Sequence, residues 1–342
     1  MKQVKTVSAV GHILCHDLTQ IIPNEYKGAR FRKGHIVTEE DIPVLLSMGK
    51  ENLYVWEKKE GFLHEDEGAE ILVSLCQNEH MTRSETKEGK IELFADCDGF
   101  FEVNRQILKQ LNSLGEIMIA SRHGNTYVKK GDKLVGTRVI PLVIDEKKLD
   151  TAKKIAGDTP IFKITPFKHK KAAILVTGNE VKKGLIEDKF SDVVKEKFKE
   201  FGADVFEPVL VGDDNAETTK QILKHIEMGA DIVVCTGGMS VDPDDKTPLA
   251  IKNTGADIIS YGSPVLPGAM FLLSYYGDKK IPVCGLPGCV MYAKRTIFDL
   301  ILPYLMADIP VNLDTLAGLG EGGLCLNCET CTYPNCGFGK GH

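Results

Sequence analysis

The stretch that decides the fold is Asp231 to Pro248, DIVVCTGGMSVDPDDKTP. Its opening run, Ile232 to Cys235, is apolar and mostly β-branched, which is typical of a strand buried on both faces of a parallel sheet. Gly237 and Gly238 end that strand, and the Thr247-Pro248 pair predicts a helix start, because proline is tolerated in a first helical turn. A strand, two glycines and a helix start predict a place where backbone N–H groups face an anion.

Three carboxylates follow the two glycines, at Asp242, Asp244 and Asp245. Their charge disfavours a phosphate alone but suits Mg²⁺, which binds carboxylate and phosphate oxygens together. Two plainer interpretations stay open. The glycines are equally consistent with a tight turn, and Asp244 and Asp245 with acidic residues that the dipole of a helix N-terminus favours.

The same alternation of strand and helix continues on both sides of this stretch. It predicts an α/β domain over residues 171–308, with three layers and a mostly parallel sheet. In such a domain, the loops at the carboxyl ends of the strands carry the ligand site. The rest of the chain is expected to form an N-terminal α+β module, a β-rich middle module, a polar connector and a Gly/Cys-rich tail, at residues 1–60, 61–150, 151–170 and 309–342, respectively.

Composition narrows the class of protein. The 342 residues carry a formal charge of −6, which argues against a nucleic-acid surface. No apolar run approaches the roughly 20 residues of a membrane helix, and the N-terminus does not resemble a signal peptide. We therefore expect a cytoplasmic protein with no membrane partner.

The tail carries the strongest purely chemical signal, four cysteines spaced Cys325-x₂-Cys328-x₂-Cys331-x₄-Cys336. In a cytoplasmic chain such clustering favours a metal centre over disulfides. An iron–sulfur cluster and a Cys₄ zinc site both fit the spacing, and the cluster is slightly favoured. The glycines between Gly318 and Gly323 predict that the tail is a tethered appendage outside the sheet.

Three loops at predicted strand ends occur in a specific order: Thr177 to Glu180, Thr236 to Gly238 with the aspartates behind it, and Gly285 to Gly288. That order resembles the molybdopterin-binding domain of the molybdenum insertase (molybdopterin molybdotransferase) family. The resemblance covers about residues 170–306. It implies a transferase role in molybdenum cofactor biosynthesis, in which Mg²⁺ and acidic residues assist hydrolysis of adenylylated molybdopterin as molybdate is inserted. A homo-oligomer is also implied.

The resemblance assigns roles by position. Molybdopterin would contact the first loop, the aspartate after the next strand, the glycine turn and the last loop, that is, Thr177, Gly178, Asp214, Gly237, Gly238, Ser240, Pro287 and Gly288. Gly237, Gly238 and Ser240 would offer backbone and hydroxyl donors. The acidic residues of the chemistry would be Glu180, Asp213, Asp242 and Asp245, with Asp242 or Asp245 facing the metal.

The chain departs from the family pattern at Asn179, Phe190 and Cys289. These departures and the added tail support an alternative function, a non-catalytic molybdopterin carrier or a maturation partner of a molybdoenzyme. In that alternative the cysteine tail senses redox state or docks. Cys289 itself is interpreted as an inert buried thiol or, near a helix N-terminus, as one with a lowered pKa.

Overall fold

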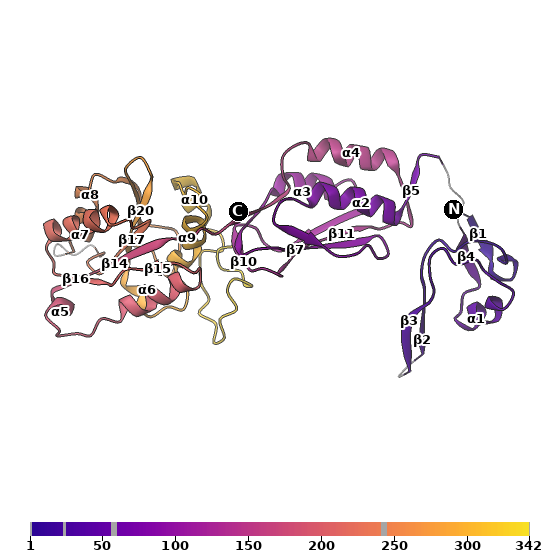
Figure 1. The fold of residues 1–342 in the computed structure, drawn as a ribbon, viewed down its shortest axis with the longest axis horizontal. Coiled ribbons are helices and arrows are strands. Elements are labelled where there is room, and N and C mark those ends of the chain that lie inside the picture. Colours follow the sequence, from indigo (N-terminus) through magenta and orange to yellow (C-terminus); the bar gives the residue numbers. More distant parts are fainter. Residues whose placement is uncertain (1, 23–24, 56–59, 241–244, 342) are drawn as a thin grey trace. The chain divides into compact units, whose positions relative to one another are not determined.

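The computed structural model describes all residues except 1, 23–24, 56–59, 241–244 and 342. The chain divides into two compact units, whose elements are labelled in Figure 1. Unit 1 contains Met1–Asp96, Val103–Arg122 and Lys130–Lys163. Unit 2 contains Cys97–Glu102, His123–Lys129 and Ile164–His342.

Unit 2 is built on one large sheet. Among the described residues seven strands form it, in the order β15-β14-β17-β20-β19-β18, with β16 paired to β14. The strands are β14 (Lys171–Thr177), β15 (Asp204–Val205), β16 (Val209–Val211), β17 (Ile232–Thr236), β18 (Asp257–Tyr261), β19 (Leu272–Tyr276) and β20 (Ile281–Leu286). β14 pairs in parallel with β15, β16 and β17, and β17 pairs in parallel with β20. β19 pairs antiparallel with both β20 and β18, so among these seven strands β19 alone runs in the opposite direction, which confirms the expected mostly parallel sheet.

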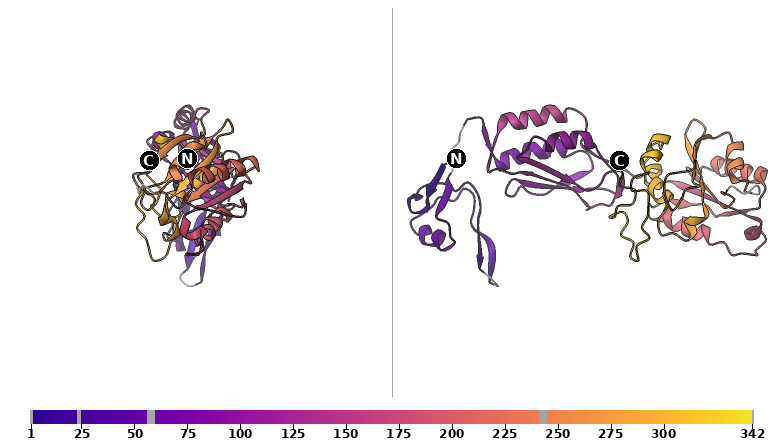
Figure 2. Two further views of the ribbon diagram at one scale, coloured as in Figure 1. Left: turned by 90° about the vertical axis from the view of Figure 1, so that its left-hand side faces the viewer. Right: turned by 180° about the vertical axis from the view of Figure 1, so that it is seen from behind.

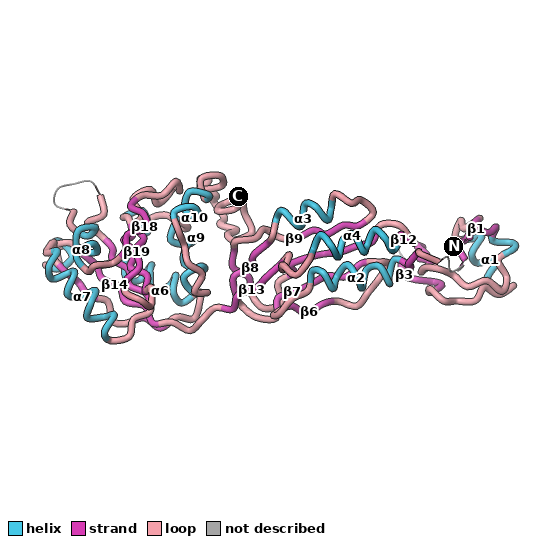
Figure 3. Tube along the Cα trace, turned by 90° about the horizontal axis from the view of Figure 1, so that it is seen from above, coloured by secondary structure: helices cyan, strands magenta, loops and turns pink. Residues whose placement is uncertain are grey.

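Helices cover both faces of this sheet. Figure 3 shows α7 (Asn215–Glu227) and α8 (Thr247–Asn253) on one side of the strands, and α6 (Phe190–Lys199) and α9 (Ile297–Met306) on the other. Successive strand residues point to opposite faces. Val234 therefore packs in the core that contains Phe198 and Phe298, while Val233 packs in the core that contains Ile222 and Ile251. The expected three layers are confirmed.

Two separate helices follow the third loop. A short 3₁₀ helix, η2 (Gly288–Met291), comes first, and α9 begins only after Thr296. The Thr296 hydroxyl accepts from the Phe298 N–H, and the Asp299 carboxylate accepts from the Thr296 N–H at 2.7 Å. This capping box starts α9 where the apolar run begins. Pro287 and Gly288 thus lead into η2, not into the first turn of α9.

Part of the expected middle module packs with unit 2. The strands β10 (Thr126–Val128), β8 (Gly99–Val103) and β13 (Phe162–Pro166) form a sheet in the order β10-β8-β13. The ring of Phe100 lies 4.2 Å from that of Tyr304 between centroids, inside the core of unit 2. The predicted boundary at residue 150 therefore does not divide the chain into its packed units.

The expected connector at 151–170 is also structured. It contains the second half of α4 (Glu146–Ala156) and the strand β13. Leu149, Ala152 and Ala156 of α4 are buried, and their spacing of three and four residues forms an apolar stripe. The surrounding lysines lower the mean hydropathy of this segment, so the stripe was missed.

Unit 1 holds an antiparallel sheet in the order β6-β7-β11-β9, made of Met81–Arg83, Lys90–Ala95, Lys133–Val139 and Ile117–Ser121. The helices α2 (Glu65–Cys76), α3 (Arg105–Asn112) and α4 lie over one face of it, as Figure 1 and the right-hand view of Figure 2 show. A further pair, β5 (Phe62–His64) with β12 (Val143–Asp145), flanks them. The middle of the chain is thus rich in strands, as expected, and helices pack on one face of its sheet.

The N-terminal part of unit 1 is a small α+β assembly, as expected. It pairs β1 (Lys2–Lys5) with β4 (Asn52–Val55) and β2 (Leu18–Ile22) with β3 (Tyr26–Phe31), and adds η1 (Thr6–Ser8) and α1 (Asp41–Ser47). Its core includes Leu14, Val37, Leu45 and Leu53. Among the described residues, no helix of either unit is long and apolar enough to cross a membrane.

Candidate functional site

The three predicted loops end at one edge of the unit 2 sheet. In the parallel registers, Thr177 lies opposite Val211, Val176 opposite Thr236, and Thr236 opposite Leu286. The strands β16, β14, β17 and β20 therefore finish at the same level, and the residues that follow them share this edge. We call it the carboxyl edge. It is where a parallel α/β sheet places its ligand.

The turn at Gly237 and Gly238 admits no side chain. Both residues have a positive φ, +85° and +54°. A Cβ at Gly237 would collide with the carbonyl oxygen of Thr177, and one at Gly238 would lie 2.8 Å from the Thr247 hydroxyl. The two glycines are required both for their backbone conformation and for close packing.

Hydrogen bonds from two threonine hydroxyls stabilise this turn. The Thr177 hydroxyl donates to the Thr236 carbonyl at 3.1 Å, and the Thr247 hydroxyl donates to the Gly237 carbonyl at 2.9 Å. The two hydroxyl oxygens are 3.0 Å apart. Thr177 is buried, so it positions the turn more than it lines the surface. Thr247 was missed as a site residue, although its place before a proline at a helix start marked it.

One polar group at the carboxyl edge is unsatisfied. The hydroxyl of Thr236 is buried and has no hydrogen-bond partner within the described part of the chain. Buried hydroxyls are normally bonded, because losing water without a new partner costs free energy. A water molecule or a polar ligand atom at this edge would supply the missing bond.

Asn179 and Asp213 join the first loop to the residues that follow β16. The Asp213 carboxylate accepts from the Asn179 N–H at 3.1 Å, and the Asn179 side-chain oxygen accepts from the Asp213 N–H at 3.4 Å. A Cβ at Gly212 would lie 2.7 Å from that same oxygen. The asparagine at position 179 thus supplies an acceptor and puts no second negative charge beside Asp213.

Two neighbouring charges border this pair. Glu180 is exposed in the first turn of the short helix α5 (Asn179–Lys182). The side chain of Lys182 lies close to Gly212. A Cβ built on Gly212 would be 3.7 Å from the Lys182 Nζ. Lys182 is a cation at the carboxyl edge that sequence reasoning missed, since nothing in a Lys-rich segment distinguished it.

Two of the predicted acidic residues have structural partners. The Asp214 carboxylate caps α7 and accepts from the N–H groups of Ala216 at 2.9 Å and Glu217 at 3.3 Å. The Asp245 carboxylate accepts from the Ser240 N–H at 2.7 Å. The Ser240 N–H is therefore bonded within the loop, and the Ser240 hydroxyl stays a predicted donor to the ligand. Asp242 and Asp244 lie outside the described residues.

The third loop brings Pro287 and Gly288 to the same edge, Pro287 buried and Gly288 exposed. Cys289 follows at half burial, and burial raises its pKa. Because its pKa is raised, Cys289 fits the interpretation as an inert buried thiol better than the interpretation as a thiol with a lowered pKa. Cys235 in β17 is a core residue, as expected, and burial raises its pKa to about 12.

The tail is packed, not a free appendage. After α10 (Leu313–Gly318) it runs along the domain, where the Cys325 N–H donates to the Leu266 carbonyl at 2.8 Å. The Tyr333 hydroxyl donates to the Asp299 carbonyl at 2.9 Å, and Phe338 is buried in the core of unit 2. These two aromatic side chains supply the apolar anchors that the glycine-rich composition concealed.

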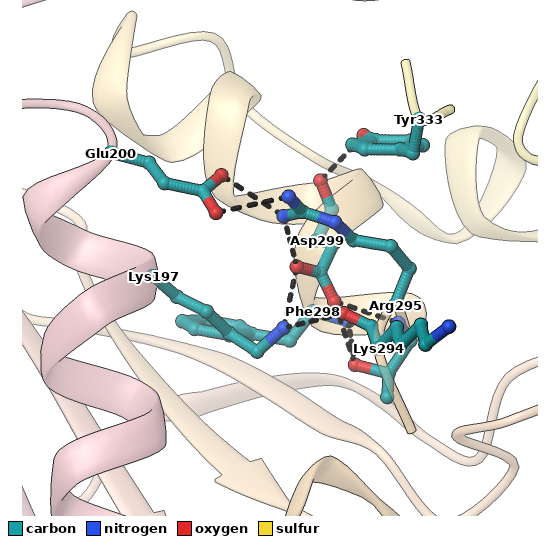
Figure 4. A network of polar contacts seen from close by, with 8 residues as sticks. Lys197, Glu200, Lys294, Arg295, Phe298, Asp299 and Tyr333 are labelled. Carbon is teal, nitrogen blue, oxygen red and sulfur yellow. Dashed lines mark hydrogen bonds and ion pairs between the residues drawn. The ribbon is translucent and has the colours of Figure 1, made fainter. Parts of the chain in front are cut away.

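An ionic network lies beneath the tail (Figure 4). Lys197 of α6 bonds Asp299 at 2.6 Å, and Arg295 bonds Asp299 at 3.0 Å. Arg295 also holds both oxygens of Glu200 and lies 5.0 Å from the centroid of the Tyr333 ring. The tail is thus attached to helices on the α6–α9 face of the sheet.

The four tail cysteines line one cavity of about 610 Å³. Cys289, Lys294 and Arg295 also line it. Cys289 and the four tail cysteines are free thiols. Within the described residues no three His, Cys, Asp or Glu side chains are placed to hold a metal ion.

Comparison with known proteins agrees with this geometry. Residues 173–307 match the family model described as "Probable molybdopterin binding domain". The chain contains a domain of this family. Residues 3–57 match a second model, "Domain of unknown function (DUF8806)". The molybdopterin-binding match spans the sheet of unit 2 together with the loops of the carboxyl edge.

Individual relatives match a limited part of the chain. The chain is 27% identical to "Probable FAD synthase" of Caenorhabditis briggsae over 118 residues, 34% of this chain and 22% of that protein. It is 36% identical to "CinA-like protein" of Petrotoga mobilis over 84 residues, 25% of this chain and 21% of that protein. The match thus spans about a fifth of these relatives. The tungsten cofactor synthesizing protein MoaB from Pyrococcus furiosus is 24% identical, with a TM-score of 0.32 over 36% of this chain and 84% of that one.

Proposed function

We propose that this protein binds molybdopterin or adenylylated molybdopterin at the carboxyl edge and acts in molybdenum cofactor biosynthesis. The observation that carries the proposal is the convergence of the three loops at one edge of a sheet that matches the molybdopterin-binding family. The residues present suit such a ligand. Gly237 and Gly238 let its phosphate approach the backbone closely, and Lys182 adds a positive charge nearby.

The finer proposal is Mg²⁺-assisted molybdenum insertion. Asp213 and Asp245 each use one carboxylate oxygen to accept a backbone N–H, and the other oxygen is the proposed metal ligand. Asp242 and Glu180 are proposed to complete this acidic set. Carboxylate oxygens are the ligands that Mg²⁺ prefers, and the ion would neutralise charge on the phosphates. In this proposal molybdate is the second substrate.

A carrier function is the alternative, and a specific observation favours it. Three of the predicted acidic residues, Asp213, Asp214 and Asp245, accept backbone N–H groups and so build the loops. A site of this kind can bind the pterin without cleaving it. A molybdoenzyme would then be the partner that receives the cofactor. In either function we propose a homo-oligomer, which light scattering of the purified protein would test.

The deciding experiment measures AMP release from adenylylated molybdopterin by protein purified without oxygen. Mg²⁺ and molybdate are added in turn. Molybdate-dependent release supports insertion, and tight binding without release supports the carrier. Absence of binding would overturn both.

Variants at the carboxyl edge then test the site itself. Lys182→Ala should weaken binding about tenfold, which corresponds to about 1.4 kcal/mol, because it removes the nearby cation. Lys183→Ala is the matched control, since its side chain is exposed on the same short segment. Asp245→Asn should abolish Mg²⁺-dependent release and leave binding in place. Equal affinities for the two lysine variants would place the ligand elsewhere.

The tail cysteines are proposed to hold a metal centre, either an iron–sulfur cluster or zinc. Thiolates bind both, and the four cysteines already line one cavity.

A further inference from the structure

Unit 1 contains a pocket of its own, of about 1070 Å³. Apart from Gly28 and Ala29, every described residue that lines it has a polar or charged side chain. An apolar ligand would leave these groups without partners, so the pocket suits a hydrophilic one. Basic and acidic side chains are about equally numerous in the lining. The charge of the ligand therefore depends on which of them are buried and unpaired.

The Glu65 carboxyl lines this pocket without a partner. Glu65 is the first residue of α2 and is only 6% exposed. Within the described residues its carboxyl makes no hydrogen bond and no ion pair. It lies against Gly89, which precedes β7, because a Cβ built on that glycine would be 3.2 Å from the Glu65 Oε2. Buried carboxyls are normally hydrogen-bonded, so a polar atom that bonds Glu65 is missing from this site.

Arg138 brings an unpaired positive charge to the same pocket. It lies on β11 opposite Lys90 of β7 and is half-buried. Lys90 bonds the Glu92 carboxylate at 2.6 Å, whereas Arg138 forms no ion pair with any described residue. Its charge acts on Glu65, but the two side chains are not in contact as an ion pair. An anion can therefore bind Arg138 without displacing an existing partner.

The neighbouring cation Lys33 is already compensated. Its Nζ bonds the Asp66 carboxylate and lies 3.0 Å from His64 Nδ1. His64 is buried, and its Nε2 lies 2.6 Å from the Cys15 carbonyl oxygen. These bonds fix the first turn of α2, to which Glu65 belongs, before any ligand binds.

The protonation of Glu65 suits an anionic ligand. Burial, followed by the charge of Asp66, raises the pKa of its carboxyl to about 7, with Arg138 and Lys33 acting against the shift and Glu88 adding to it. Below that pH the carboxyl is neutral and can donate an O–H. Above it the carboxylate repels an anion.

We propose that this pocket binds the oxyanion group, a phosphate or a carboxylate, of a small polar ligand between Arg138 and Glu65. Arg138 pairs with the negative charge, since a guanidinium matches both kinds of oxyanion, and the neutral Glu65 carboxyl donates to one of the oxygens. The site lies wholly within unit 1 and uses no residue of the carboxyl edge. It is therefore independent of the proposed pterin site.

Isothermal titration calorimetry of the full chain with sulfate and with acetate tests the proposal. Both probes keep their charge between about pH 6 and about pH 8. At the lower pH, Arg138→Gln should weaken binding of the tighter probe at least about tenfold. Arg83→Gln is the matched control, because its ion pair with Glu70 lies outside the pocket. Tighter binding of sulfate assigns a phosphate-type ligand, and tighter binding of acetate assigns a carboxylate.

The pH profile separates a ligand contact from a structural role. Between about pH 6 and about pH 8 the neutral fraction of a carboxyl with a pKa of about 7 falls about tenfold, so the wild-type affinity should fall by that factor. Glu65→Gln keeps a donor and does not titrate, so its affinity should stay constant. His16 also lines the pocket, but burial lowers its pKa and it is present in both proteins.

Folding is controlled without a substitution. In the wild-type chain, replacing chloride by the tighter probe at equal ionic strength should slow hydrogen exchange around Glu65 and Gly89, as mass spectrometry would show. Unchanged exchange there would overturn the proposal. So would failure of both probes to bind, binding that survives in Arg138→Gln, an equal loss in Arg83→Gln, or the same pH profile in Glu65→Gln and the wild type.

Discussion

Lys197 of α6 and Asp299 of α9 form an ion pair of 2.6 Å in which the side chains are only 7% and 2% exposed. Arg295 shares the same carboxylate at 3.0 Å and binds Glu200 as well. Burial lowers the pKa of Arg295, but the hydrogen bonds to Glu200 and the charge of Asp299 outweigh it and raise that pKa. Two helices on one face of the sheet are thereby joined by buried charges.

Removing the shared carboxylate should be strongly destabilising. Asp299→Ala leaves Lys197 buried without a counter-charge and also removes the Thr296 cap, so we expect a loss of about 3–5 kcal/mol in the free energy of unfolding. Urea unfolding followed by circular dichroism measures it. Glu196→Ala is the control, since its pair with Lys199 is exposed and its loss should change stability little. Equal unfolding midpoints for the two variants would contradict the role of the buried pair.

The hydroxyl of Tyr333 should hold the tail. Tyr333→Phe removes the hydrogen bond to the Asp299 carbonyl and keeps the ring packing. We therefore expect the packed tail to lose about 1 kcal/mol of stability against local opening. The tail amides should exchange with solvent faster, as hydrogen exchange with mass spectrometry would show. Tyr292→Phe is the control, because Tyr292 is 82% exposed. Unchanged exchange in the tail of Tyr333→Phe would show that ring packing alone secures it.

The glycine turn offers a test of steric fit. Gly237 and Gly255 have nearly the same φ, +85° and +84°, but a Cβ meets the Thr177 carbonyl at the first and nothing within 4 Å at the second. Gly255→Ala should lower the free energy of unfolding by about 1–2 kcal/mol, from backbone strain alone. Gly237→Ala should cost clearly more and should also abolish pterin binding. Thermal unfolding of both variants makes the comparison, and equal costs would show that the close packing seen at Gly237 is relaxed in solution.

Stability of unit 1 should depend on pH through Glu65. Burial, helped by the negative charge of Asp66, raises the pKa of the Glu65 carboxyl from 4.5 to about 7. Between these values the folded chain keeps a proton that the unfolded chain releases, so stability falls as pH rises through this range and levels off above it. The expected fall attributable to Glu65 is about 3 kcal/mol, at 1.36 kcal/mol for each pKa unit.

Glu65→Gln isolates this contribution, because glutamine does not titrate. The difference in unfolding free energy between the variant and the wild type should grow from pH 4.5 to pH 7. Urea unfolding across that range measures it. Parallel pH profiles for the two proteins would mean that Glu65 titrates normally in the folded state.

The α/β domain could be predicted from sequence because its signals are local. A parallel strand buried on both faces is a continuous apolar run, as in Ile232 to Cys235, and the residues that follow such strands must share one edge. The carboxyl edge with its glycine turn, and the buried Cys235 and Cys284, follow from these patterns. For the same reason the order of the three loops was enough to indicate the molybdopterin-binding family.

Only the tertiary structure decided which groups are already bonded and which segments pack together. Asp214 and Asp245 look like ligands in the sequence, but the folded chain brings backbone N–H groups to both. The tail looks detached, yet Tyr333 meets a carbonyl of α9 from 34 positions away in the chain. Hydrogen bonds and cavities are made by residues distant in sequence, and no local pattern records them. The sequence by itself determined the sheet and its binding edge, and the fold decided how the cysteines come to surround one cavity.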